Sequence, residues 1–336
     1  MRTRFGTLLG VVLGAMAIYA GYWFYAINQA EHAFYAFVKA EQARGNSFEY
    51  GSVSFGGFPI RLGATVTGVK YSAGGLELEA GQVLIETLPW NLTNALVRAE
   101  GNVRLAYLEP DRPERIEMKP SLIFARVQAT WQGVVQQAAI EIRDPDAKGA
   151  GGNGRPFAFK AQRLQADARM ADVTTDTLDS YDLAFSADRV DLAEGFPTLL
   201  GPRLSNLRFV ARFTKLPPFS TGYRPADRRD LVRTLQANGV EAEIARFDFD
   251  WGNVVTRGIG RLALDGQRRL AGQLDFKVQG LARLIDLLFA LGILQGQAQI
   301  LKDLPTTPEG ELISLTLKDG LIAFGPYAVG ALKPLD

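Results

Sequence analysis

Apolar residues first form one long uncharged run and later alternate with polar residues, and this change divides the chain. The run extends from Phe5 to Ile27, and no charged residue lies between Arg4 and Glu31. About 20 apolar residues are enough to cross a bilayer. Arginine precedes the run and aromatic rings crowd its far end, a pattern typical of a span whose N-terminus is cytoplasmic. Residues 1–27 are therefore predicted to form a single-pass inner-membrane anchor, with the bulk of the chain in the periplasm.

A cleaved signal peptide is the alternative for this segment. Ala15-Met16-Ala17 resembles a small-residue cleavage site, but the apolar run continues well past it. We expect the anchor to remain uncleaved.

Helical periodicity continues beyond the predicted span. Apolar residues recur every three or four positions until Arg44, and Gly45 follows as an ordinary helix stop. One helix from about Phe5 to Arg44 is expected, with residues 28–45 forming its juxtamembrane amphipathic part. His32, the only histidine, falls on the exposed flank and is interpreted as an interfacial polar residue rather than a catalytic one.

After residue 45 the hydrophobic period changes to two. In Ala245–Trp251 the odd positions are apolar and the even positions are charged. Such alternation indicates half-buried antiparallel sheet, and turn signals such as Asn238-Gly239 and Asp265-Gly266 separate the stretches. We expect a mainly β periplasmic domain over residues 46–336, built as one large curved antiparallel sheet. The same alternation occurs in residues 103–107, 183–185, 207–213, 262–264, 274–278 and 313–317.

Few helices interrupt this pattern. Helices are predicted from about Pro225 to Gln236 and from Leu281 to Leu291, with a short one over Trp90–Val97, and Asp144–Pro156 has the composition of a flexible loop. The helix at 281–291 is expected to be core rather than a plug in a trough. The apolar face of the sheet must be covered, either by closure into a sandwich or barrel or by curling into an open trough. Alternation alone does not choose between these.

The stretch Gly51–Leu62 departs from strand alternation. Gly56 and Gly57 allow unusual backbone angles, and Pro59 cannot donate to a strand ladder. We interpret it as a hairpin connection that Arg61 anchors by binding a carboxylate or carbonyl. A ligand-contacting loop is the alternative.

The runs 34–45 and 48–69 resemble a bacterial family catalogued as "domain of unknown function 2125", found chiefly in alphaproteobacteria. The resemblance covers nearly the whole chain, and its turn element is Gly-Phe-Pro-x-Arg, here Gly57, Phe58, Pro59 and Arg61. It implies a membrane anchor and a β-rich exported body, and it brings no catalytic residues because the family has no established activity.

A second similarity lies at the C-terminus. Residues 251–280 and 315–335 are similar to the ends of AsmA-like envelope proteins. That similarity implies a β-sheet folded round an apolar groove and a role in phospholipid traffic or outer-membrane assembly.

Composition narrows the candidate chemistry. The chain has no cysteine, one histidine and a net charge of +1, which argues against thiolate nucleophiles, Cys/His zinc sites and nucleic-acid binding. Asp248 and Asp250 share one strand face, where solvation is expected. Asp144, Asp146 and Gly149 resemble a fragment of a calcium loop without its remaining ligands. No catalytic residue, metal site or cofactor is predicted.

The pattern favours a non-enzymatic envelope protein that binds or transfers lipid or another amphiphile. Acyl chains would gain about 0.8 kcal/mol per buried CH₂ on an apolar wall. Two alternatives stay open: a structural or interaction module that docks an envelope protein, and a carboxylate-based periplasmic hydrolase. The candidate groove consists of Phe247, Phe249, Trp251, Leu262, Leu264, Leu274 and Phe276.

Overall fold

The structure is a computed structural model, and its described part is mainly antiparallel β-sheet with three α-helices, as predicted. It divides into two compact units, Met1–Gln128 and Ala129–Asp336. The backbone is described except at residues 1, 102, 109–114, 132–133, 151–155, 172–178, 194, 197, 218–224, 226–227, 295–301, 303–306, 308 and 336. The side chains of residues 2–11, 108, 115, 198 and 228 are also outside the description.

The first unit combines one long helix with short and long strands. Helix α1 covers Arg2–Ala43, close to the predicted range. Strand β3 pairs with β1 and β2 on one side and with β4 on the other, and β4 continues to β5 and β6, always antiparallel. The strands are β1 Ser47–Glu49, β2 Ser52–Gly56, β3 Leu62–Ala73, β4 Leu76–Leu88, β5 Asn91–Glu100, β6 Arg104–Leu108, β7 Arg115–Lys119 and β8 Leu122–Ala129.

The helix predicted over Trp90–Val97 is wrong, because this stretch belongs to β5. Hydrogen bonds to β4 on one side and to β8 on the other satisfy its backbone. Short apolar stretches fit a helix and a strand almost equally well, and here the two neighbouring strands decide.

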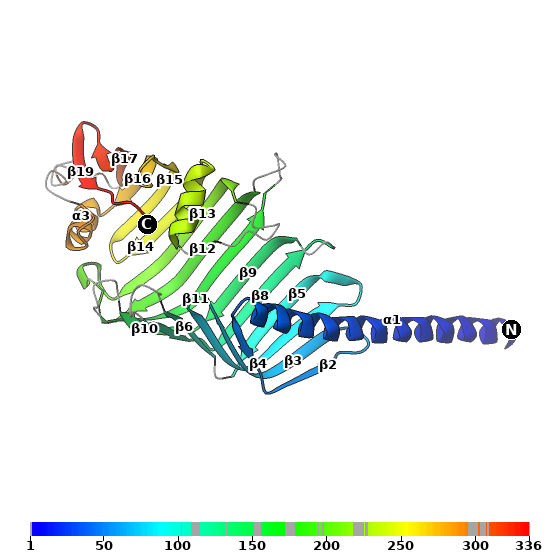
Figure 1. Cartoon of the computed structure of the whole chain (residues 1–336). Helices are drawn as coiled ribbons and strands as arrows, with labels where there is room; N and C mark the ends of the chain where they lie inside the picture. Colours follow the sequence, from blue (N-terminus) through cyan, green and yellow to red (C-terminus); the bar gives the residue numbers. More distant parts are fainter. Residues whose placement is uncertain are drawn as a thin grey trace. The chain divides into compact units, whose positions relative to one another are not determined.

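Helix α1 packs against the sheet with only part of its length. The ring of Phe34 contacts Phe48, Tyr50 and Phe55, with centroids 5.5 to 6.1 Å apart. Trp23 is buried and its indole donates a hydrogen bond of 2.9 Å to the carbonyl of Arg61. The Trp23 ring therefore packs on the protein. Figure 1 shows α1 running on beyond the strands of its unit toward the N-terminus.

Helix α1 contains the segment predicted to span the membrane. Within the part of the chain that the structure describes, no helix is long and apolar enough to cross a membrane. Residues 5–11 of the predicted span lie outside the described side chains. The membrane anchor stays a prediction.

The second unit is a meander in which successive strands are neighbours from β11 to β19, with β9 and β10 both paired to β11 (Figure 1). No pairing among the described residues joins β19 back to β9. The strands are β9 Val135–Arg143, β10 Asp146–Ala150, β11 Pro156–Met170, β12 Asp179–Leu192, β13 Arg203–Leu216, β14 Glu241–Trp251, β15 Val254–Leu264, β16 Leu270–Gln279, β17 Glu311–Lys318, β18 Leu321–Phe324 and β19 Tyr327–Ala331.

Strand β10 corrects the loop expected over Asp144–Pro156. Asp146 to Ala150 pair with the first residues of β11, and Lys160 forms an ion pair of 3.1 Å with Asp146. A glycine-rich composition predicts a loop, but the edge of a long neighbouring strand provides a ladder for residues 146–150. Residues 151–155 of the predicted loop lie outside the described residues.

Both predicted helices of this unit are present, α2 at Arg228–Ala237 and α3 at Leu281–Ala290. Helix α3 is core rather than plug. Its Ile285 packs with Val278 and Ile313, and its Leu287 packs with Trp251 and Val254. One end of the sheet's apolar face is thereby covered.

Candidate functional site

The seven predicted groove residues lie on one face of β14, β15 and β16. Phe247 pairs with Gly258 and Phe249 pairs with Thr256, while Gly258 also pairs with Phe276 on the other side. Because side chains alternate between faces along a strand, all seven residues point to the same side of the sheet. We call this side of the second unit's sheet the apolar face.

Aromatic contacts connect these residues. The rings of Phe247 and Phe249 are stacked with centroids 6.4 Å apart, and Phe247 meets Phe276 edge-on at 6.0 Å. Phe249 in turn meets Trp251 at 6.1 Å. Such offset and edge-to-face pairs stabilise one another beyond simple burial, so the cluster is a defined surface.

Two glycines of β15 allow side chains from β16 to lie flat on the sheet. A Cβ atom at Gly258 would lie 2.4 Å from Cδ1 of Phe276, and one at Gly260 would lie 2.6 Å from Cδ2 of Leu274. Glycine in the interior of a strand often marks such a close approach. The apolar face is therefore lined by rings and methyl groups that lie over bare backbone.

The apolar face extends further than the sequence predicted. Phe185 and Ile140 have 39% and 37% of their surface exposed. The alternation of Phe185 and Phe209 was visible in the sequence, but their alignment with Phe247 depends on the strand register, which the sequence does not give. One row of paired residues crosses the sheet and contains no charged side chain: Ile140, Ala166, Phe185, Phe209, Phe247, Gly258, Phe276 and Ile313.

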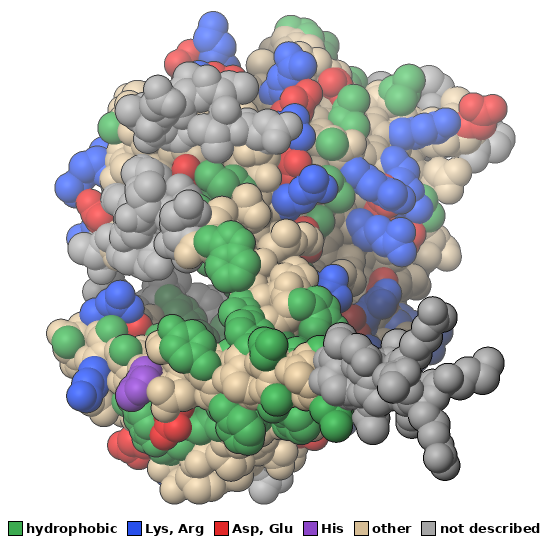
Figure 2. Space-filling view, turned by 90° about the vertical axis from the view of Figure 1, so that its right-hand side faces the viewer, with side chains coloured by type: hydrophobic (Ala, Val, Ile, Leu, Met, Phe, Trp, Pro, Cys, Tyr) green, Lys and Arg blue, Asp and Glu red, His purple; other side chains and the backbone are tan. Residues whose placement is uncertain are grey.

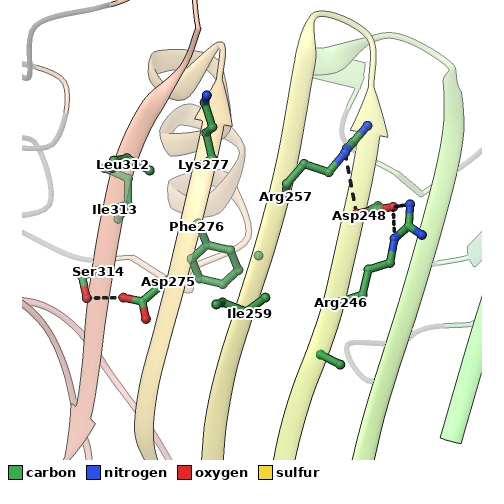
Figure 3. A pocket seen from close by; sticks show the side chains of 12 residues that line it. Arg246, Asp248, Arg257, Ile259, Asp275, Phe276, Lys277, Leu312, Ile313 and Ser314 are labelled. Carbon is green, nitrogen blue, oxygen red and sulfur yellow. Dashed lines mark hydrogen bonds and ion pairs between the residues drawn. The ribbon is translucent and has the colours of Figure 1, made fainter.

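The opposite face of the same strands carries a shallow hollow of about 550 Å³. Figure 3 shows Asp248 between Arg246 and Arg257 in its wall. The guanidinium groups approach the carboxylate to 2.5 and 3.6 Å. Exposed Leu312 and Ile259 also line the hollow.

The predicted solvation of Asp248 is wrong, because its side chain is only 5% exposed beneath the two arginines. Asp250 belongs to the same network. Burial by itself raises the pKa of Asp250, but hydrogen bonds from Arg257 and Asn206 and the charge of Arg257 outweigh it and lower this pKa. A general acid for glycoside hydrolysis needs the opposite shift.

The remaining sequence candidates give no site. His32 is exposed on α1, where it was expected. Among the described residues no group of histidine and carboxylate side chains has the arrangement of a metal site. Asp146, part of the calcium-like fragment, is ion-paired with Lys160.

The Gly57–Arg61 segment forms the connection between β2 and β3, and its two ends are tied together. Arg61 binds the carboxylate of Glu86 at 2.9 Å, the kind of partner predicted for it. Gly57 has a φ angle of +110°, and a Cβ atom there would lie 2.7 Å from the Arg61 carbonyl oxygen. This position therefore requires glycine.

Comparison with protein families identifies the family to which the chain belongs. The model of a family described as "Uncharacterized protein conserved in bacteria (DUF2125)" matches residues 23–333, and the chain belongs to this family. No curated protein matches the chain. The similarity to AsmA-like proteins and the alphaproteobacterial origin stay predictions.

Proposed function

We propose that this member of the DUF2125 family binds a phospholipid, or another amphiphile with an acyl chain, on the apolar face of its second unit. In this proposal α1 holds the protein to the bacterial inner membrane, the strands lie in the periplasm, and the protein acts by binding rather than by catalysis. The observation that carries the proposal is the uncharged row from Ile140 to Ile313, which includes exposed Phe185.

The chemistry of the row fits an acyl chain. It offers aromatic and aliphatic side chains over a long path, and no group in it would demand a hydrogen bond. A fully buried CH₂ gains about 0.8 kcal/mol. A chain on a single wall is covered on one side, so ten methylene groups contribute about 4 kcal/mol.

The charged groups support binding rather than hydrolysis. Asp248 and Asp250 pair with arginines and lie on the opposite face of β14 from Phe247 and Phe249. The lowered pKa of Asp250 favours its charged form, whereas hydrolysis of a glycosidic bond needs a protonated carboxyl beside an ionised one.

The experiment compares lipid bound to the full chain and to two matched variants. The protein is extracted from bacterial membranes in mild detergent and separated by gel filtration, and its phospholipid is measured by mass spectrometry. Phe185→Asp charges the apolar face, and Leu312→Asp charges an exposed position on the opposite face. Both variants keep the same lipid around α1, so a difference in the amount of bound phospholipid reports on binding to the apolar face.

We expect Phe185→Asp to lose most of the phospholipid bound beyond that around α1, and Leu312→Asp to retain it. Ile140→Asp serves as a second variant, since this position is also exposed in the same row. Equal lipid in all variants would contradict the proposal. A protein that co-purifies with the wild type but not with Phe185→Asp would instead support the alternative function, in which the apolar face docks an envelope protein.

A further inference from the structure

We propose that two turns of the first unit enter the surface of the membrane beside α1 and fix the height of the sheet above the bilayer. The β2–β3 turn is Gly57–Arg61, and the β4–β5 turn is Leu88–Asn91. The inference rests on the proposed membrane anchoring of α1. It adds a second, non-helical membrane contact to that anchor.

Both turns lie at the same end of the sheet. Leu62, which follows the first turn, pairs with Thr87, which precedes the second, and Leu88 pairs with Asn91 across the second turn. Strands β3 and β4 are long, so the opposite turn at Gly74 is about 40 Å away.

Three aromatic side chains of α1 tie both turns to the helix. The hydroxyl of Tyr19 donates to the carbonyl of Pro59, and the hydroxyl of Tyr22 donates to the carbonyl of Pro89 at 2.7 Å. Trp23 donates to the carbonyl of Arg61 at 2.9 Å. Residues at spacings of three and four lie on one helix face. The turns are therefore held at the level where α1 leaves the sheet.

The tips of these turns are apolar and exposed. Phe58, Ile60 and Trp90 have 53%, 60% and 64% of their surface exposed. Neither 57–60 nor 88–90 contains a charged residue, and the charge of Arg61 is paired with Glu86. Figure 2 faces the side toward which α1 projects, and hydrophobic side chains gather in the lower part of that view.

A bilayer is the occupant that fits this surface, because the surface continues into α1. The helix residues just before the turns, including Leu13, Met16 and Ile18, are exposed and apolar. A protein partner would have to cover the helix and both turns together. Exposed tryptophan and phenylalanine beside an apolar helix are typical of the boundary between headgroups and acyl chains.

The length of the free helix supports the same conclusion. From Trp23 onward the helix packs on the protein, since Trp23 and Ala26 are buried against Leu62. The segment from Phe5 to Ile18 covers about 21 Å at 1.5 Å per residue. The hydrocarbon core is about 30 Å thick. The free segment is shorter than the hydrocarbon core. If it is inserted in the bilayer, the turns at its base must therefore lie at the boundary of the membrane.

Spin labels test the proposal directly, because the chain has no cysteine. Ile60→Cys and Trp90→Cys place a nitroxide on each turn. Leu76→Cys is the matched control, an exposed apolar position of the same unit at the far end of β4. The full chain is reconstituted into vesicles of phosphatidylethanolamine and phosphatidylglycerol. Flotation is checked first, and collision with oxygen and with a water-soluble nickel chelate is then measured by power saturation.

We expect labels at 60 and 90 to favour oxygen over the chelate, giving a positive depth parameter, and the label at 76 to give a negative one. Protein that floats while all three labels favour the chelate would overturn this inference and leave the anchor intact. Protein that does not float would overturn the anchor and the inference together. Loss of lipid binding by the apolar face affects neither outcome.

Discussion

The hydroxyl of Tyr71 on β3 donates a hydrogen bond of 2.9 Å to the buried carboxylate of Glu41 near the end of α1. Asn46 donates a second bond of 2.7 Å to the same carboxylate, and Arg44 pairs with it. Glu41 thereby fixes the last turn of the helix to the first strands. One buried charged group therefore helps to hold the C-terminal end of α1 on its sheet.

The first prediction concerns pH. Hydrogen bonds from Asn46 and Tyr71 lower the pKa of Glu41 from its ordinary value of 4.5, although burial opposes them. A carboxyl whose folded pKa is lowered stabilises the fold above its unfolded pKa, and this stability is lost as pH falls through the folded pKa. Wild type should therefore lose stability below about pH 4.5 relative to Glu41→Gln, as measured by thermal unfolding at a series of pH values.

At neutral pH Glu41→Gln should be the less stable protein, and the difference in stability should shrink as the pH falls. Tyr71→Phe removes one hydrogen bond to a charged group and should cost about 1.5 kcal/mol. A pH-independent difference between Glu41→Gln and wild type would contradict this role of the carboxylate.

The second prediction concerns the β2–β3 turn. Gly57→Ala forces an alanine to a φ angle of +110° with its Cβ against the Arg61 carbonyl, so we expect a loss of more than about 1 kcal/mol in denaturant unfolding. Gly56→Ala is the matched control, since its Cβ would meet no atom within 4 Å. Similar losses at both positions would show that the backbone angle is not the cause.

The third prediction concerns a buried hydroxyl. Thr256 Oγ1 is buried on the apolar face, between Phe249 and Val278 in the strand register, without a hydrogen-bond partner. Thr256→Val keeps the shape and removes the unpaired group, so thermal stability should rise by about 1 kcal/mol. Thr316→Val, at an exposed position of β17, should give no such gain. A destabilised Thr256→Val protein would indicate that the hydroxyl has a bonding role.

The fourth prediction links β15 to ligand binding. Gly258→Ala pushes a methyl group into the ring of Phe276, which must then leave its place in the row. We expect reduced phospholipid binding as well as a loss of stability, measured on the same purified protein. Gly266→Ala, with open space around it, controls for the loss of a glycine. Retained binding with Gly258→Ala would show that Phe276 does not contact the ligand.

Sequence reasoning found the apolar face where alternation was strict. Strands β14 to β16 alternate cleanly, and their seven apolar residues do share one face. Phe185 and Ile140 were missed because they join the row only through register between strands, a long-range property. The segment 90–97 was assigned to a helix because neighbouring strands, not local periodicity, decide its structure.

Side-chain geometry was the second property that the sequence could not predict. Alternation places Asp248 on the polar face correctly, but a polar face is solvated only if nothing lies over it. Two long arginine side chains bury this carboxylate, and arginines commonly lie along a surface in this way. For the same reason the bonds from Tyr19 and Tyr22 to the turns follow from folded geometry alone.

The most direct test of lipid binding places a photoreactive benzoyl-phenylalanine at single positions in the full chain. Positions 185 and 209 lie in the apolar row, and position 312 lies on the opposite face. After irradiation of bacterial membranes, we expect phospholipid to be cross-linked at 185 and 209 and not at 312. Equal phospholipid cross-linking at all three positions, or cross-linking only to protein at 185 and 209, would contradict the account.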